Sequence, residues 1–134
     1  MKSLFCKLLS LLCFFAMMNV VSSHAQLTTK VSFTTTSPFV VEKTTLPAGA
    51  YTIRPFSDDP DAYELTSSTG HSVIFNCENS GEATKNELTF HRYGSMLYLK
   101  QISAGGAACF VPAGPAEKQA KKSGKPTKET ITVS

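Results

Sequence analysis

Short stretches in which apolar and polar residues alternate follow one another along most of this chain. Clusters of Gly, Pro, Asp, Asn and Ser separate them, and no long apolar pattern of helical period follows residue 25. Alternation with a period of two is typical of half-buried strands. We therefore expect strands at 29–35, 39–43, 50–56, 62–67, 71–78, 88–91, 96–102 and 107–112. The pattern predicts an all-β fold, a small antiparallel β-barrel or sandwich of about seven or eight strands.

The stretch 38–53 contains the clearest turn signal. Pro47 presets its own φ, Gly49 is free to adopt a positive φ, and Tyr51 and Ile53 then resume the alternation. These residues predict two strands joined by a tight corner. Farther along the chain, residues 68–70 and 92–95 are expected to be hairpin turns. The polar segment 79–86 is expected to be a loop.

The N-terminal segment has the features of a secretory signal peptide. Two lysines flank the start of an apolar run at 8–21, and small residues allow a cut between Ala25 and Gln26. The run is about 14 residues long, too short for a spanning helix of roughly 20. Cys6 precedes the run and Cys13 lies in its middle, so neither stands where a lipoprotein is acylated. We expect residues 1–25 to be removed and the mature chain, without a transmembrane segment, to be exported to the periplasm or beyond the cell.

Charge is unevenly distributed over the mature chain. Residues 26–114 contain six basic and eight acidic residues, whereas 115–134 contain five lysines and two glutamates. The body of the protein therefore has no excess of positive charge for a nucleic-acid backbone. Residues 115–134 are poor in large apolar side chains and are predicted to be a disordered tail after a β domain at 26–114. The tail lysines are either simply solvated, the plainer interpretation, or contact anionic lipid, polysaccharide or cell wall: Lys118, Lys121, Lys122, Lys125 and Lys128.

Cys77 and Cys109 are the only cysteines of the mature chain. Both fall on the apolar side of predicted strands, and an exported protein meets an oxidising environment. A disulfide between them is therefore expected. The alternative is a pair of buried free thiols that act as small apolar side chains.

The most suggestive polar group is His91 with Arg92 and Tyr93. An imidazole beside a guanidinium and a phenol is suited to binding an anion or transferring a proton. The plainer interpretation is that Arg92 and Tyr93 cover the rim of the core at the end of a hairpin. His71 opens a strand and is expected to be solvated.

Several carboxylates lie close together at Asp58, Asp59, Asp61 and Glu64. Calcium prefers such oxygen ligands, but the spacing is not that of an EF-hand and Pro60 interrupts it, so an ordinary acidic turn is the better interpretation. The chain has no nucleophile-elbow, zinc-protease or phosphate-loop motif. We expect no catalytic centre, cofactor or metal ion.

Two motifs together resemble a family of small, uncharacterised exported β-proteins that is common in acidobacterial genomes. The first is the Leu-Pro-Ala-Gly-Ala-Tyr corner at 46–51, and the second is Phe-His-Arg-Tyr-Gly at 90–94. The resemblance spans roughly residues 31–112. It departs at Glu42-Lys43, where the family pattern has a glycine-containing turn. The resemblance implies export and a β fold but no particular activity.

These observations favour an exported, non-enzymatic β domain that acts by binding or structural contact in the cell envelope, with an envelope component or polysaccharide as partner. A first alternative is a lipocalin-like barrel around a small apolar ligand, because strand 96–102 is apolar on both faces. A second alternative is a metal-dependent or hydrolytic module that uses His91, Arg92 and Tyr93.

Overall fold

The computed structural model describes residues 27–134, which form eleven strands and one helix. The signal peptide predicted at 1–25 and its cut between Ala25 and Gln26 lie outside the described residues. No helix in the described part is long and apolar enough to cross a membrane. The elements are β1 (Val31–Thr35), β2 (Phe39–Val41), β3 (Thr44–Leu46), β4 (Gly49–Pro55), β5 (Ala62–Ser67), β6 (Ser72–Asn76), β7 (Glu78–Glu82), β8 (Glu87–Tyr93), β9 (Met96–Ala104), β10 (Ala107–Phe110), α2 (Pro115–Ser123) and β11 (Thr127–Thr132).

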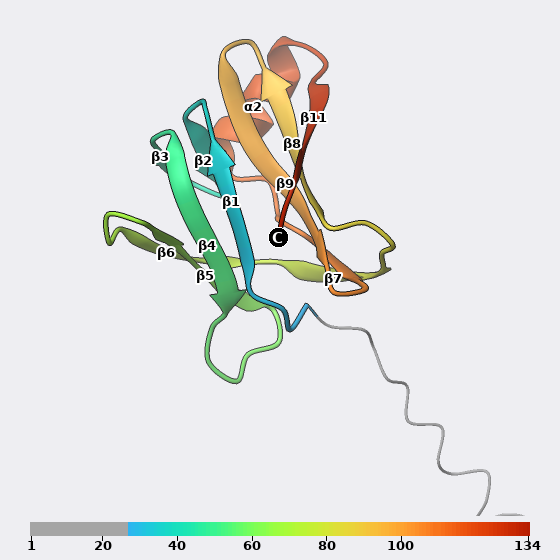
Figure 1. Cartoon of the computed structure of the whole chain (residues 1–134). Coiled ribbons are helices and arrows are strands. Elements are labelled where there is room, and N and C mark those ends of the chain that lie inside the picture. The colour runs from blue at the N-terminus through green and yellow to red at the C-terminus, as the bar shows by residue number, and fades with distance from the viewer. Residues whose placement is uncertain (1–26) are drawn as a thin grey trace, which may run out of the picture.

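The strands form two curled sheets that together make a half-barrel or sandwich (Figure 1). Sheet A has the strand order β1-β4-β5-β6, and sheet B has the order β11-β8-β9-β10-β7. The short hairpin β2–β3 joins sheet B through a parallel pairing of β2 with β9. All the other pairings are antiparallel. The all-β prediction is confirmed.

The strand count is higher than the seven or eight predicted, for three reasons. The corner contains an additional strand, β3, and the C-terminal segment adds β11. The predicted loop at 79–86 instead begins as β7, whose five residues are all exposed. Because β7 is held by backbone pairing with β10 rather than by burial, its sequence shows no apolar alternation.

The corner at 38–53 consists of two turns. The first is Glu42-Lys43 between β2 and β3, where Glu42 adopts a φ of 54°. The second runs through Pro47 to Gly49, which has a φ of 155°, and the Tyr51 hydroxyl closes it by donating to the Pro47 carbonyl. The predicted corner is present at Pro47 to Gly49, and a turn without glycine precedes it.

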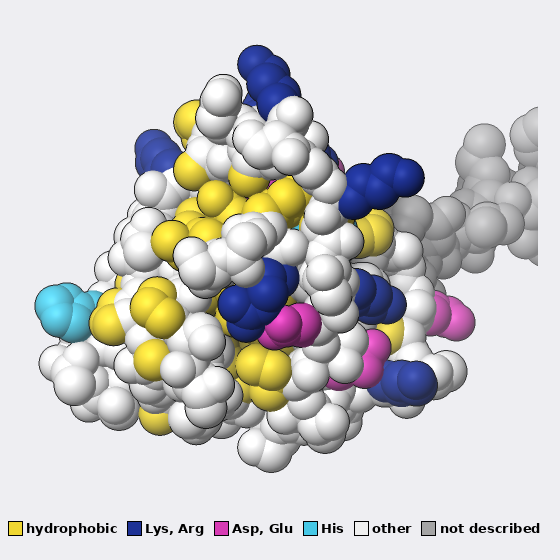
Figure 2. Space-filling view, turned by 90° about the horizontal axis from the view of Figure 1, so that it is seen from above, with side chains coloured by type: hydrophobic (Ala, Val, Ile, Leu, Met, Phe, Trp, Pro, Cys, Tyr) yellow, Lys and Arg dark blue, Asp and Glu magenta, His cyan; other side chains and the backbone are white. Residues whose placement is uncertain are grey.

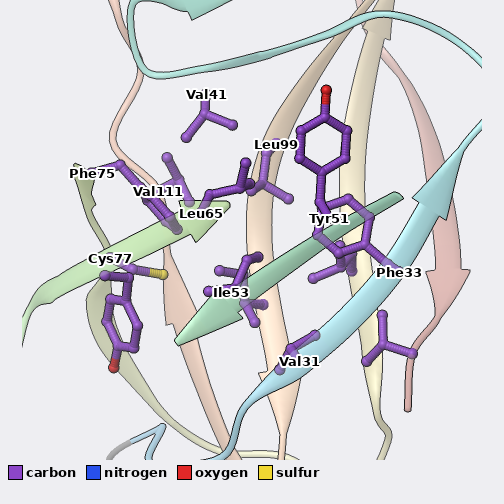
Figure 3. Packing of buried hydrophobic residues seen from close by; sticks show 14 of the residues in the cluster. Val31, Phe33, Val41, Tyr51, Ile53, Leu65, Phe75, Cys77, Leu99 and Val111 are labelled. Carbon is purple, nitrogen blue, oxygen red and sulfur yellow. The ribbon is translucent and has the colours of Figure 1, made fainter. Parts of the chain in front are cut away.

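Aromatic rings fill the space between the two sheets. The ring centroid of Phe39 lies 5.0 Å from that of Tyr51, 5.8 Å from that of Phe90 and 6.0 Å from that of Phe33. Phe33 and Tyr51 stack side by side, as Figure 3 shows. Branched aliphatic side chains pack around these rings, so the interior is occupied by the chain's own side chains.

The expected disulfide between Cys77 and Cys109 is present, with the two Cα atoms 5.3 Å apart. Cys77 lies where the chain leaves sheet A after β6, and Cys109 lies on β10 of sheet B. Both residues are buried. The bond therefore joins the two sheets at one edge of the sandwich.

The prediction that residues 115–134 form a disordered tail is wrong. They form α2 and then β11, which pairs with β8 along its whole length. Ile131 and Val133 pack against the core, and Ser134 exchanges backbone hydrogen bonds with Ser32 of β1. The composition of the segment does not reveal this folded structure, because backbone pairing and a few specific contacts hold the segment in place and it buries no large apolar area.

Candidate functional site

The structure separates the three residues that the sequence placed together. Alternation along β8 puts Arg92 on the side of the core residue Phe90, where it forms an ion pair with Glu129 of β11. His91 and Tyr93 extend from the opposite face, and the Tyr93 ring contacts that of Tyr98 at 5.7 Å. His91, Arg92 and Tyr93 therefore do not form one site.

The helix α2 covers part of the outer face of sheet B; in Figure 1 it lies behind β8 and β9. Lys100 of β9 donates to Glu117 of α2 at 2.8 Å and to the Val111 carbonyl at 3.0 Å. The Glu117 side chain is only 2% exposed and that of Lys100 is 12% exposed. The helix is thus attached to the sheet by a buried ion pair.

The local sequence explains why a helix forms here. Gly114 precedes the helix and Pro115 occupies its first turn, where a missing N–H is harmless. Glu117 lies in the first turn and Lys121 and Lys122 lie in the last, so both ends complement the helix dipole. The Gly114–Pro115 pair and the single lysine within the apolar strand 96–102 were the signals in the sequence that could have revealed this contact.

Two buried polar atoms beside this contact have no hydrogen-bond partner within the described residues, His91 Nδ1 and the Tyr93 hydroxyl. Burial lowers the pKa of His91, and the positive charges of Lys100, Lys121 and Lys128 lower it further, partly offset by Glu117. Burial also raises the pKa of Tyr93. Both side chains are therefore uncharged at neutral pH.

This arrangement predicts a loss of stability at mildly acidic pH. Because the folded-state pKa of His91 lies below its ordinary value of 6.5, the unfolded chain binds the proton more readily. The contribution of the uncharged His91 to the free energy of unfolding is present above pH 6.5 and is lost as the pH falls from 6.5 toward the lower folded-state pKa. We expect the urea midpoint to fall less between about pH 7 and pH 5 in His91→Gln than in the wild type. The control variant His71→Gln, at an exposed position, should show the same fall of the urea midpoint as the wild type. If the midpoint of His91→Gln falls as much as that of the wild type, buried His91 is not the cause of the acid sensitivity.

Five lysines surround this region and are all exposed; we call Lys118, Lys121, Lys122, Lys125 and Lys128 the lysine surface. The first three follow helical spacing, which places them on one side of α2. Both acids of the segment are already paired, Glu117 with Lys100 and Glu129 with Arg92. Figure 2, a view from above Figure 1, shows Lys and Arg side chains projecting at several points of the outline, with Asp and Glu side chains beside some of the others. The surface therefore has an uncompensated positive charge.

A hollow of about 480 Å³ adjoins the lysine surface, lined by Tyr93, Gly94, Ala120, Ser123, Gly124 and Lys125. A second hollow, of about 740 Å³, lies over β1, β4 and β5 and extends to Ser134. Its floor includes a cross-strand row of hydroxyl side chains on sheet A, Ser32, Thr52 and Thr66. Arg54 at its edge is already paired with Glu64 at 2.6 Å.

The acidic turn does not form a metal site. Asp59 accepts a hydrogen bond from the backbone N–H of Asp61, as in an ordinary turn, and Glu64 accepts from Arg54 and Thr66. Across residues 27–134, no group of three His, Cys, Asp or Glu side chains is arranged to hold a metal ion. His71 is exposed at the β5–β6 turn, on sheet A, whereas His91 lies on sheet B.

No protein-family model, curated protein or solved structure matches this chain. The resemblance to the acidobacterial family therefore stays a prediction.

Proposed function

We propose that this protein is an exported, non-catalytic β domain of the cell envelope that binds an anionic polysaccharide through the lysine surface. The observation that carries the proposal is that residues 115–134 are folded. The helix α2, the strand β11 and the turn between them display five lysines, while both acids of the segment are paired with other residues. Fixed charges on a rigid element lose less entropy on binding than charges on a disordered tail. The disulfide suits an oxidising compartment and so supports export.

A polysaccharide is favoured over a lipid membrane by the composition of α2. The helix contains no apolar side chain larger than Ala116, Ala120 and Pro115. Helices that lie in a membrane interface insert Trp, Phe or Leu on one face, and α2 has none of these. The filled interior likewise argues against an enclosed apolar ligand.

Removing lysines from α2 is expected to weaken binding of a model anionic polysaccharide, polygalacturonate. The triple variant Lys118→Gln, Lys121→Gln and Lys122→Gln should bind about tenfold more weakly, because each lysine near an anionic array contributes up to about 1 kcal/mol before screening. Calorimetry at low salt provides the measurement, and wild-type affinity should fall as the salt concentration rises.

A second triple variant removes the same charge elsewhere and serves as the control. Lys30→Gln, Lys43→Gln and Lys85→Gln are exposed positions outside the lysine surface and should leave the affinity almost unchanged. Neutral dextran should not bind. Equal losses in the two triple variants, or equal binding of dextran, would overturn the proposal.

A further inference from the structure

Sheet A ends at β6, and the outer edge of this strand offers backbone groups for pairing. In the ladder between β5 and β6, Ser67 N–H donates to the His71 carbonyl and Cys77 N–H donates to the Asp61 carbonyl. Odd-numbered residues from 71 to 77 therefore direct their backbone groups toward β5. The even-numbered residues Ser72, Ile74 and Asn76 direct theirs away from the sheet.

Strand β6 lacks the features that usually protect an exposed edge. Its sequence, Ser-Val-Ile-Phe-Asn, contains neither a charged residue nor a proline, and the Ile74 side chain is 54% exposed. Protected edges have charges, prolines, bulges or a covering segment.

The other strand edges carry such features. The edge of β1 pairs with Ser134, and β7 contains Glu78 and Glu82 and has a bulge of its own at Ser80, which has no partner residue in the register with β10. Strand β3 has only three residues and is followed by Pro47, and β11 contains Lys128 and Glu129. Among the described strands, β6 is thus the least protected.

We propose that β6 is an interface through which two copies of this chain pair, antiparallel and centred on Ile74. In this register Ile74 of one copy lies opposite Ile74 of the other, and Ser72 lies opposite Asn76. Because the strand is uncharged, no like charges meet when it pairs with itself. The two-fold arrangement also closes on itself, so it gives a dimer with one continuous sheet and not a fibre.

One side chain limits this pairing in the isolated chain. The Glu42 carboxylate accepts a hydrogen bond from Asn76 N–H at 3.0 Å and so occupies one end of the open edge. Glu42 does this from a turn position with a φ of 54°, a conformation that favours glycine. Its carboxylate therefore acts as a cap that competes with the second copy for Asn76 N–H.

Sedimentation equilibrium from about 1 μM to about 1 mM tests the proposal, a range that covers weak pairing. The wild type should show a reversible, concentration-dependent dimer. Ile74→Lys should be monomeric throughout, whereas Phe110→Lys, at a similarly exposed position on β10, should dimerise like the wild type. Glu42→Gly suits the turn and frees Asn76 N–H, so it should dimerise about tenfold more tightly.

Ile74→Pro separates loss of pairing from loss of folding. The Ile74 N–H points away from β5, so proline removes no hydrogen bond within the sheet and is tolerated at such an edge. This variant should unfold like the wild type in urea and remain monomeric. A wild type and Glu42→Gly that are both monomeric up to the highest concentration would overturn the proposal, as would equal weakening by Phe110→Lys.

Discussion

Replacing both cysteines, Cys77→Ala with Cys109→Ala, is expected to lower the free energy of unfolding by about 3 to 4 kcal/mol. The bond joins positions 32 residues apart in the sequence, so it removes a large amount of entropy from the unfolded chain. It also connects the end of β6 to β10 and hence sheet A to sheet B. A domain with such a small core has little stability to spare. Urea unfolding monitored by circular dichroism measures the difference.

Reductant supplies the control for this prediction. Dithiothreitol should destabilise the wild type by a similar amount and leave the double-alanine variant unchanged. A loss below about 1 kcal/mol would contradict the account, because it would mean that the unfolded chain is barely constrained by the bond.

The second large effect is expected for Glu117→Gln, which leaves the buried Lys100 ammonium without its counter-charge. Breaking a buried ion pair by removing one partner destabilises a protein by about 3 to 5 kcal/mol, and we expect the low end because Lys100 also donates to the Val111 carbonyl. Since α2 has no large apolar side chain, the helix should detach locally. Hydrogen exchange at 115–123 and urea unfolding report the two consequences.

Two further variants distinguish the cost of a buried, unpaired charge from the cost of losing an ion pair near the surface. Replacing Lys100 and Glu117 together by methionine should recover most of the lost stability, since no unpaired charge remains. Glu129→Gln breaks the more exposed ion pair with Arg92 and should lower the stability by less than about 1 kcal/mol. If Glu117→Gln and Glu129→Gln lower the free energy of unfolding equally, the buried ion pair stabilises the protein no more than the exposed one.

Much of the fold could be predicted because alternation with a period of two is a local signal. The hairpins β5–β6 and β8–β9 lie where the pattern placed them, and the disulfide joins the expected cysteines. The C-terminal segment could not be predicted from composition. It is stabilised by pairing with β8 and by the Lys100–Glu117 contact, both of which depend on residues far away in the sequence.

The candidate site was predicted less well than the fold. His91, Arg92 and Tyr93 are neighbours in sequence, but successive side chains of a strand point to opposite faces, so adjacency was the wrong criterion. The tail lysines were noted in the sequence, where simple solvation was the plainer interpretation. Their interpretation changed once the segment proved to be ordered, because a helix gathers residues three and four apart on one side.

A titration of the ¹⁵N-labelled protein with oligogalacturonate, followed by two-dimensional NMR, shows which residues contact an anionic polysaccharide. We predict that the largest shift changes fall on residues 115–128, with smaller changes at His91 beneath them, and that they weaken as salt is added. Changes confined to the hydroxyl row of Ser32, Thr52 and Thr66, with residues 115–128 unaffected, would contradict the account.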